Sequence, residues 1–152
     1  MPRTGIRGMV AALDRANAAM GTLIAATAGT DIDWTMVAAI GIRETGFRNI
    51  AERNGGLGRG IFQIDIGQNK VTESQAFDPT FAANWAANRL DTNMATLAAK
   101  FPNLDPTQLL QATAASWNLG VGGISGNPST IDVGSPGNNY GSNILGLIDC
   151  FH

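Results

Sequence analysis

Glu44 is the residue of this sequence best placed to do chemistry, because it puts a carboxylate where a helix should carry an apolar side chain. Met36, Val37 and Ile40 lie at helical spacing and predict the apolar stripe of one helix. Glu44 follows Ile40 by four residues, so it shares that stripe and points toward the interior. Burial raises the pKa of a carboxyl, which suits a general acid near neutral pH. The alternative is a surface carboxylate at a fraying helix end.

The elements that must position Glu44 can be predicted from periodicity and from helix-breaking residues. An alanine-rich helix is predicted over residues 6–28, and a second over residues 33–43 with Asp33 as its N-cap. Residues 48–69 lack helical periodicity and contain five glycines. We interpret them as a loop and a small β-hairpin region, with GIFQIDI (60–66) as its best strand.

The C-terminal half is predicted to be helical, with one long irregular segment. One helix should cover residues 78–100, with Pro79 in its first turn, and another should begin near residue 104 and run to Trp117. Residues 119–139 are rich in Gly, Pro, Ser and Asn and predict a long loop, of a kind that is usually functional or mobile. A last short helix is expected over residues 140–150.

Composition indicates a folded domain and argues against some function classes. The chain has 152 residues, of which 44% are hydrophobic and 14% charged, so we expect a single domain over residues 1–152. Its predicted class is α+β, mostly α, with helices around the small β-hairpin region. The net charge of −2 lacks the basic footprint of a nucleic-acid-binding protein. No segment is apolar enough to predict a membrane span, so we expect no membrane partner.

The two ends of the chain give weaker signals. The charges of Arg3, Arg7 and Asp14 interrupt any secretory core, so we expect no signal peptide and delivery by another route. Cys150 is the one cysteine, which rules out an internal disulfide, and we expect it to pack as a small apolar side chain. The terminal His152 is expected to have no role.

A local excess of arginine surrounds the Glu44 region of an otherwise acidic chain. We predict a basic rim suited to an anionic polymer. Four unrelated surface arginines are the alternative interpretation. The four are Arg43, Arg48, Arg53 and Arg59.

Four segments, taken together and in order, resemble the goose-type lysozymes and, more distantly, the lytic transglycosylases (family 23 glycoside hydrolases). They are RETGF (43–47), NGGLGRGIFQID (54–65), ASWNLG (115–120) and IDVGSPGNNYGSN (131–143). The resemblance extends from residue 34 to the C-terminus, and each motif is weak alone. It implies a lysozyme-like fold with a glycan-binding cleft.

The resemblance also implies roles for individual residues. Glu44 matches the family's general acid, and Asp65 matches an aspartate that places or activates the attacking water. Gln63 matches a glutamine of the strand that lines the cleft. Asn118 matches an asparagine that contacts the sugar or orients the acid, and Tyr140 matches a tyrosine whose hydroxyl neighbours the acid.

The sequence departs from the family's pattern at two positions. Trp117 replaces a tyrosine, and Asn54 stands where goose-type enzymes often carry another acidic residue, which leaves Asp65 as the one strong base candidate. We expect Trp117 and Asn54 to contact substrate. Structural readings remain open: Asp65 as a turn residue, Asn118 as a helix C-cap, and Trp117 and Tyr140 as core aromatics.

The function implied by the resemblance is that of a muramidase needing no metal or cofactor. It would hydrolyse the β-1,4 bond between N-acetylmuramic acid and N-acetylglucosamine in peptidoglycan, with inversion. The alternatives are a lytic transglycosylase, a phage endolysin and, from another class, an inactive glycan-binding module. Among biological settings we favour an antibacterial toxin delivered by type VI secretion into the target periplasm. Such a toxin would have a cognate immunity protein that occludes the active site.

Overall fold

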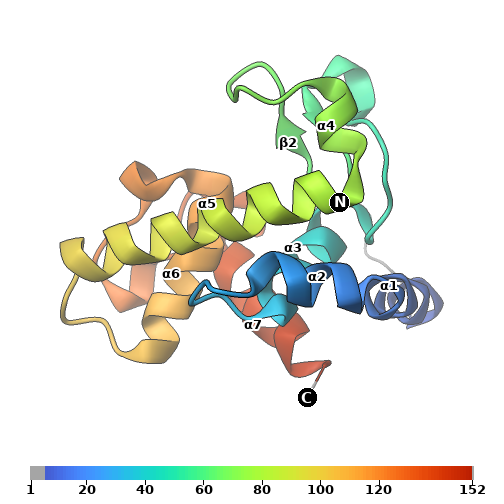
Figure 1. Cartoon of the computed structure of the whole chain (residues 1–152). Coiled ribbons are helices and arrows are strands. Elements are labelled where there is room, and N and C mark those ends of the chain that lie inside the picture. The colour runs from blue at the N-terminus through green and yellow to red at the C-terminus, as the bar shows by residue number, and fades with distance from the viewer. Residues whose placement is uncertain (1–5, 152) are drawn as a thin grey trace.

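The computed structural model of the protein describes residues 6–151 and confirms the predicted class. Helices make up 65% of the chain and strands 3%, so the fold is α+β and mostly α (Figure 1). The α-helices are α1 (Ile6–Ala18), α2 (Met20–Thr27), α3 (Trp34–Thr45), α4 (Glu73–Phe77), α5 (Pro79–Lys100), α6 (Pro106–Leu119) and α7 (Tyr140–Asp149). The strands are β1 (Gly58–Arg59) and β2 (Ile64–Asp65), and four short 3-10 helices are η1 (Arg53–Gly55), η2 (Val121–Gly123), η3 (Pro128–Thr130) and η4 (Pro136–Asn138).

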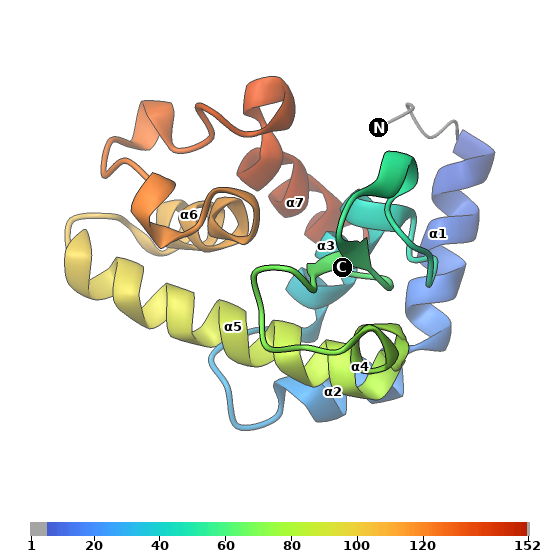
Figure 2. The same ribbon diagram turned by 90° about the horizontal axis from the view of Figure 1, so that it is seen from above.

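The long helices surround α3, which is the central helix of the main hydrophobic core. α5 packs against α2 and α6, and α7 packs against α6 and α3 (Figures 1 and 2). Met36, Val37 and Ile40 are 2%, 0% and 0% exposed, so the predicted apolar stripe is confirmed. Every residue from Thr35 to Ile42 is buried, however, so α3 is enclosed on all sides rather than along one stripe.

The single helix predicted over residues 6–28 is wrong, because the chain bends between α1 and α2. Ala19 leaves the helical region, with φ −93° and ψ 5°. The two helices take different directions (Figure 2). Arg15 holds α1 in place by donating from Nε and Nη2 to the Gly46 carbonyl at 3.0 and 2.8 Å. Both helices bury apolar residues in the same core, Ala12 and Ala16 from α1 and Leu23 from α2.

The predicted start of the Glu44 helix is confirmed. The Asp33 side chain accepts a hydrogen bond from the Thr35 N–H at 3.2 Å, as an N-cap does. The helix ends two residues later than expected, at Thr45, and Gly46 follows in the left-handed conformation with φ 63°. The Thr45 hydroxyl donates to the Ile61 carbonyl at 2.8 Å, which fixes the β region against the end of α3.

The strand predicted over residues 60–66 is wrong over most of its length. β1 and β2 are two residues each and pair antiparallel, Gly58 with Asp65. The segment between them is a turn, in which Gly60 (φ 80°) and Gln63 (φ 53°) are left-handed. Ile61 and Phe62 are both buried, whereas a strand would send two consecutive side chains to opposite faces.

The helices predicted in the C-terminal half are confirmed with small shifts. Asp78 caps α5 ahead of Pro79, and Asp105 caps α6 in a capping box with Gln108. α4 was not predicted. The Cys150 side chain is exposed rather than packed, because it follows the last turn of α7. His152 lies outside the described residues.

The long segment before α7 is ordered by one buried aspartate. Asp132 is 6% exposed and accepts hydrogen bonds from the Gly141 and Ser142 N–H groups at 2.7 and 3.0 Å. It also accepts from Gln111 Nε2 at 2.9 Å. A carboxylate at the N-terminus of a helix suits the positive end of its dipole. Asp132 thereby fixes the first turn of α7, where Tyr140 lies.

No helix among residues 6–151 has both the length and the apolar character that a membrane crossing requires.

Candidate active site

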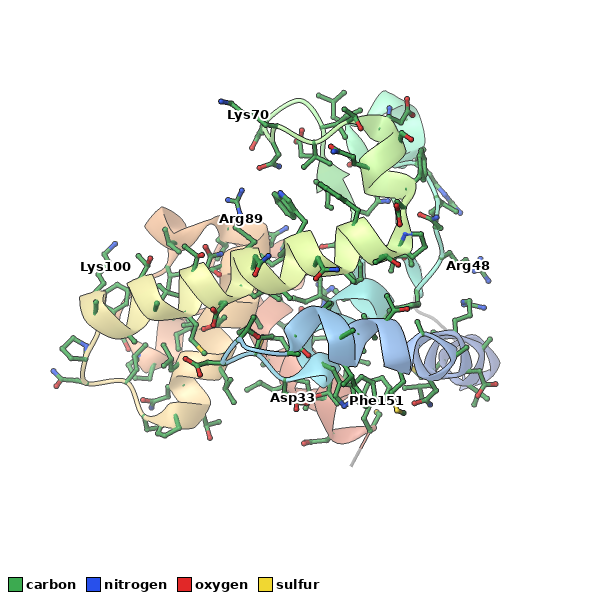
Figure 3. All side chains as sticks on the ribbon, in the orientation of Figure 1. Asp33, Arg48, Lys70, Arg89, Lys100 and Phe151 are labelled. Carbon is green, nitrogen blue, oxygen red and sulfur yellow. The ribbon has the colours of Figure 1, made fainter. Side chains whose placement is uncertain are left out.

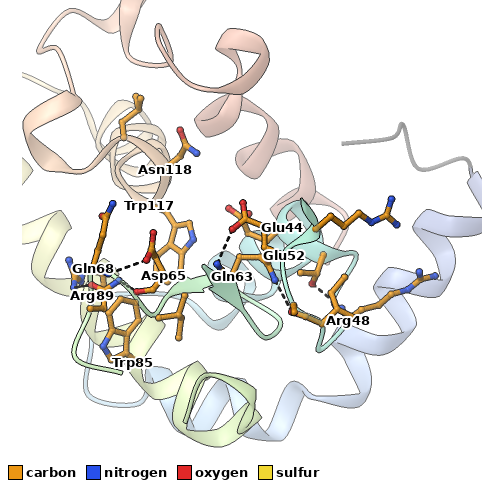
Figure 4. Close-up of a pocket in the computed structure, with 18 of the residues that line it drawn as sticks. Glu44, Arg48, Glu52, Gln63, Asp65, Gln68, Trp85, Arg89, Trp117 and Asn118 are labelled. Atoms are coloured by element: carbon orange, nitrogen blue, oxygen red, sulfur yellow. Dashed lines mark hydrogen bonds between the residues drawn. The ribbon is translucent and has the colours of Figure 1, made fainter. Parts of the chain in front are cut away.

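A long groove crosses the molecule between the β region and helices α5 and α6 (Figure 4). Its volume is about 1190 Å³, at or above the upper end for sites that enclose one small molecule, roughly 300–1,000 Å³. The groove is therefore larger than a typical site for one small molecule. Six of the residues predicted for the site line it: Glu44, Asn54, Gln63, Asp65, Trp117 and Asn118.

Glu44 lies in the last turn of α3, half-buried in the wall of this groove. Its Oε1 accepts a hydrogen bond from the Tyr140 hydroxyl at 2.8 Å. The pKa of Glu44 is raised above its usual value, chiefly because burial disfavours the charged carboxylate. The Tyr140 hydrogen bond and the nearby Arg43 charge lower that pKa, and the Glu52 charge raises it. A carboxyl with a raised pKa can hold and donate a proton closer to neutral pH.

Tyr140 is buried, contacts the Glu44 carboxyl and does not line the groove. Its side chain is 2% exposed and is not among the groove-lining residues, and its hydroxyl neighbours the Glu44 carboxyl as the resemblance implies. Burial and the Glu44 carboxylate raise the pKa of Tyr140 well above its ordinary value, so the hydroxyl keeps its proton and donates a hydrogen bond to Glu44. The Arg43 guanidinium lies 5.0 Å from the centre of the Tyr140 ring. Tyr140 is therefore a positioning residue.

Tyr140→Phe tests this role through the pH profile. The hydroxyl stabilises the charged form of Glu44, so its loss should raise the pKa of Glu44 further. A general acid works while protonated, so the alkaline limb of the pH–rate profile should move to higher pH, with activity lowered about tenfold. The measurement is the initial rate of peptidoglycan cleavage against pH. An unchanged limb and rate would make Tyr140 a core aromatic only.

Asp65 lies in the groove, but its carboxylate is partly committed to local structure. Oδ1 accepts hydrogen bonds from the Gly67 and Gln68 N–H groups at 2.8 and 3.0 Å, so Asp65 also closes a turn. Figure 4 shows it on the Trp117 side of the groove. Oδ2 has no partner among the described residues and is free to accept a hydrogen bond from a water. The turn and the catalytic role proposed for Asp65 are thus compatible.

Glu52 is a carboxylate that sequence reasoning missed. It lines the groove beside Glu44, and its charge is one of those that raise the pKa of Glu44 (Figure 4). Its Oε2 accepts a hydrogen bond from the Gly58 N–H at 2.9 Å, which fixes the side chain across the glycine-rich turn. Asp65 is therefore not the sole base candidate. The signal in the sequence was an acidic residue eight positions after Glu44, just before the glycines.

Gln63 and Asn54 line the groove from two strained positions. Gln63 (φ 53°) donates from Nε2 to the Ile50 and Gly60 carbonyls, both at 2.9 Å. Its amide nitrogen is thus occupied in holding the turn, and its carbonyl oxygen remains for substrate. Asn54 has φ 60° and is exposed. A left-handed non-glycine residue costs free energy, and such residues cluster at functional sites.

Trp117 and Asn118 lie at the other end of the groove, in the last turn of α6. Asn118 is inside the helix rather than its C-cap, which is Gly120 with φ 70°. Trp117 is partly buried and meets Trp85 of α5 edge to face, with ring centroids 5.8 Å apart. The predicted role of Trp117 as a groove residue is thus compatible with its packing against the core.

The predicted basic rim is partly wrong. Arg48 and Arg53 line the groove, but Arg43 and Arg59 do not. Arg43 donates to Asn143 Oδ1 at 2.7 Å and to the Pro136 carbonyl at 3.0 Å, which ties α3 to α7. Arg59 forms an ion pair with Glu73 at 3.0 Å. The groove arginines that sequence reasoning missed are Arg15 and Arg89.

The site shows no sign of a metal centre within residues 6–151. No group of three or more His, Cys, Asp or Glu side chains there could hold a metal ion. Buried side-chain polar atoms of the described residues all have hydrogen-bond partners.

Comparison with protein-family models gives no match, and comparison with curated proteins gives none either.

Proposed function

We propose that this protein is a muramidase that hydrolyses the β-1,4 bond between N-acetylmuramic acid and N-acetylglucosamine in peptidoglycan. The observation that carries the proposal is a half-buried Glu44 of raised pKa in the wall of a groove that holds two further carboxylates, Glu52 and Asp65. A proton donor paired with a second carboxylate is the machinery of glycoside hydrolysis. The resemblance of four sequence segments to goose-type lysozymes supports the same reaction.

In the proposed reaction, Glu44 donates its proton to the glycosidic oxygen as the bond to the anomeric carbon breaks. A water on the opposite face of the sugar attacks that carbon and gives its proton to a carboxylate. Asp65 is the base that accepts this proton. The negative charge of Glu52 raises the pKa of Glu44 and so favours its protonated form. Inversion requires room for the water, with the two carboxyl groups about 6.5–9.5 Å apart.

The rival reaction is that of a lytic transglycosylase, in which the muramoyl 6-hydroxyl replaces water. Mass spectrometry of digested peptidoglycan separates the two, because hydrolysis leaves reducing muramic acid ends and transglycosylation leaves anhydro ends. We expect reducing ends. Anhydro ends would move the protein to the rival class, and no products would indicate an inactive glycan-binding module. Reduction of the products with borodeuteride identifies the reducing residue and so distinguishes a muramidase from a glucosaminidase.

The biological setting that we propose is an antibacterial toxin acting in the periplasm of a target cell. A producer of such a toxin needs a cognate immunity protein against its sister cells. The groove is concave and carries Arg48 and Arg53 on its wall, so an inhibitor with acidic loops would suit it. Inhibition by such a protein should be competitive with glycan and weakened by Arg48→Ala. Co-purification with the product of the adjacent gene, followed by a lysis assay, tests this. A neighbouring holin gene would favour a phage endolysin instead.

A further inference from the structure

Arg89 is a groove residue whose position is fixed before any ligand arrives. It projects from the middle of α5 (Figure 3), and its guanidinium lies 4.7 Å from the centre of the Trp85 ring, one helical turn earlier. Its Nη2 donates to Asn69 Oδ1 at 3.0 Å. The ring on one side and the amide on the other restrict the rotamers of this exposed side chain. A fixed guanidinium loses less entropy on binding than a free one.

The guanidinium of Arg89 forms no ion pair with another described side chain. Among the described side chains, those of residues 8–151, the one ion pair joins Arg59 to Glu73, so Arg89 has no carboxylate partner among them. One N–H of its guanidinium is used by Asn69, and the other hydrogen atoms remain for a ligand. The planar fork of arginine matches the two oxygens of a carboxylate.

Aromatic surface suited to a sugar ring lies next to this guanidinium. Trp85 and Trp117 are both partly exposed in the groove, with ring planes at 80° to each other. The Asn93 amide donates to the buried Ser116 hydroxyl at 3.0 Å, which links α5 to α6. Figure 4 shows Trp85, Trp117 and Arg89 grouped together, away from Arg48 at the other end.

We propose that Trp85, Trp117 and Arg89 form a subsite for an acidic sugar unit, in which the tryptophans contact the ring and Arg89 binds a carboxylate. This inference rests on the proposed function and specifies which chemical group of the glycan the groove binds. In peptidoglycan, the carboxylate is either the lactyl group of a muramoyl unit from which the peptide has been removed or a carboxylate of the peptide stem. A neutral N-acetylglucosamine oligomer offers the ring without the charge.

The experiment measures the binding of defined glycans by calorimetry. Every protein tested carries Glu44→Gln, so that no turnover occurs. Arg89→Gln should weaken binding of muramoyl glycan strands about tenfold, because it removes a charge-assisted hydrogen-bond pair. Binding of an N-acetylglucosamine hexamer should change less than twofold. Arg89→Lys should restore part of the loss on the acidic strands, and the loss should shrink at high salt.

Lys100→Gln is the matched control, since it removes the same charge from the end of the same helix, outside the groove (Figure 3). It should leave both affinities unchanged, and circular dichroism checks the fold of every variant. Strands with and without peptide stems locate the carboxylate: a loss for Arg89→Gln only with stems present assigns it to the peptide, and a loss that persists without them assigns it to the lactyl group.

The proposal is overturned if Arg89→Gln weakens the neutral and acidic glycans equally, because Arg89 would then only support Trp85. It is also overturned if the acidic strands bind unchanged. Failure of the proposed function looks different, because the protein with Glu44 intact would then release no products from peptidoglycan, whatever the binding results.

Discussion

Glu44→Gln should abolish the hydrolysis of purified peptidoglycan, lowering the rate by at least about 10²- to 10⁴-fold. Glutamine has nearly the same shape as glutamate and its Oε1 can still accept the Tyr140 hydrogen bond, but its amide has no acidic proton to transfer to a glycosidic oxygen. The groove and its other carboxylates should be unaffected. The measurement is the fall in turbidity of a cell-wall suspension. A folded variant with near wild-type activity would remove Glu44 from the mechanism.

The same substitution has a second expected result, which serves as its folding control. Because the pKa of Glu44 is raised in the folded chain, the unfolded chain binds fewer protons there as the pH rises above the usual glutamate value. The free energy of unfolding therefore falls with rising pH through that interval, and the ionised Glu44 costs stability near neutrality. Glu44→Gln removes this cost. Its melting temperature at pH 7 should equal or exceed that of the unchanged protein, which separates lost chemistry from lost structure.

The other large effect is expected at the second carboxylate. Asp65→Asn should lower the rate about tenfold to a hundredfold, because a water hydrogen-bonded to an amide has no base to take its proton. The asparagine oxygen can still accept from the Gly67 and Gln68 N–H groups, so the turn should survive. Initial rates on the same cell walls provide the measurement.

Glu52→Gln is the matched variant, since it removes a carboxylate from the same groove. Its charge raises the pKa of Glu44, so its loss should move the alkaline limb of the pH–rate profile to lower pH, opposite to Tyr140→Phe. A silent Asp65→Asn beside an inactive Glu52→Gln would transfer the base role to Glu52. If both are silent while Asn54→Ala is not, the water is held by other residues.

The helix that carries Glu44 could be predicted from the sequence, but the direction of its side chain could not. The helix, its Asp33 cap and its buried stripe are local features, set by spacing and short-range hydrogen bonds. The stripe, however, does not distinguish an inward-facing residue, because α3 is buried on every side up to Ile42. Glu44 reaches the groove because the helix ends there, at a turn toward Gly46. That position depends on what packs against the helix end.

The β region shows why local patterns failed elsewhere. GIFQIDI has the composition of a strand, yet Ile61 and Phe62 both enter the core and Gln63 is left-handed. The Thr45 hydroxyl of α3 donates to the Ile61 carbonyl within this turn, and the Gln63 amide donates to the Ile50 carbonyl outside it. Such tertiary contacts override strand propensity. No periodicity in the sequence encodes them.

The arginines illustrate the same limit for surface charges. Arg43 and Arg48 are close in sequence but lie in different surroundings. Arg43, on α3, contacts α7, whereas Arg48, in the loop after α3, lines the groove. Arg89 lies far from both in the sequence and shares the groove with Arg48. Charge density along a sequence therefore predicted a basic region without identifying the side chains that form it.

The hydrogen bond between Tyr140 and Glu44 joins residues separated by 96 positions, and the bond from Arg43 to Asn143 spans 100. Contacts of such sequence separation are costly in chain entropy, and they form only when distant segments have come together. The helix that bears Glu44 can form earlier from local interactions, but its carboxyl then has neither the burial nor the partner that set its pKa. Glu44 therefore gains its Tyr140 partner only when α7, the last helix of the described chain, has packed against α3. A nascent or partly unfolded chain therefore holds Glu44 without the raised pKa that the proposed reaction needs.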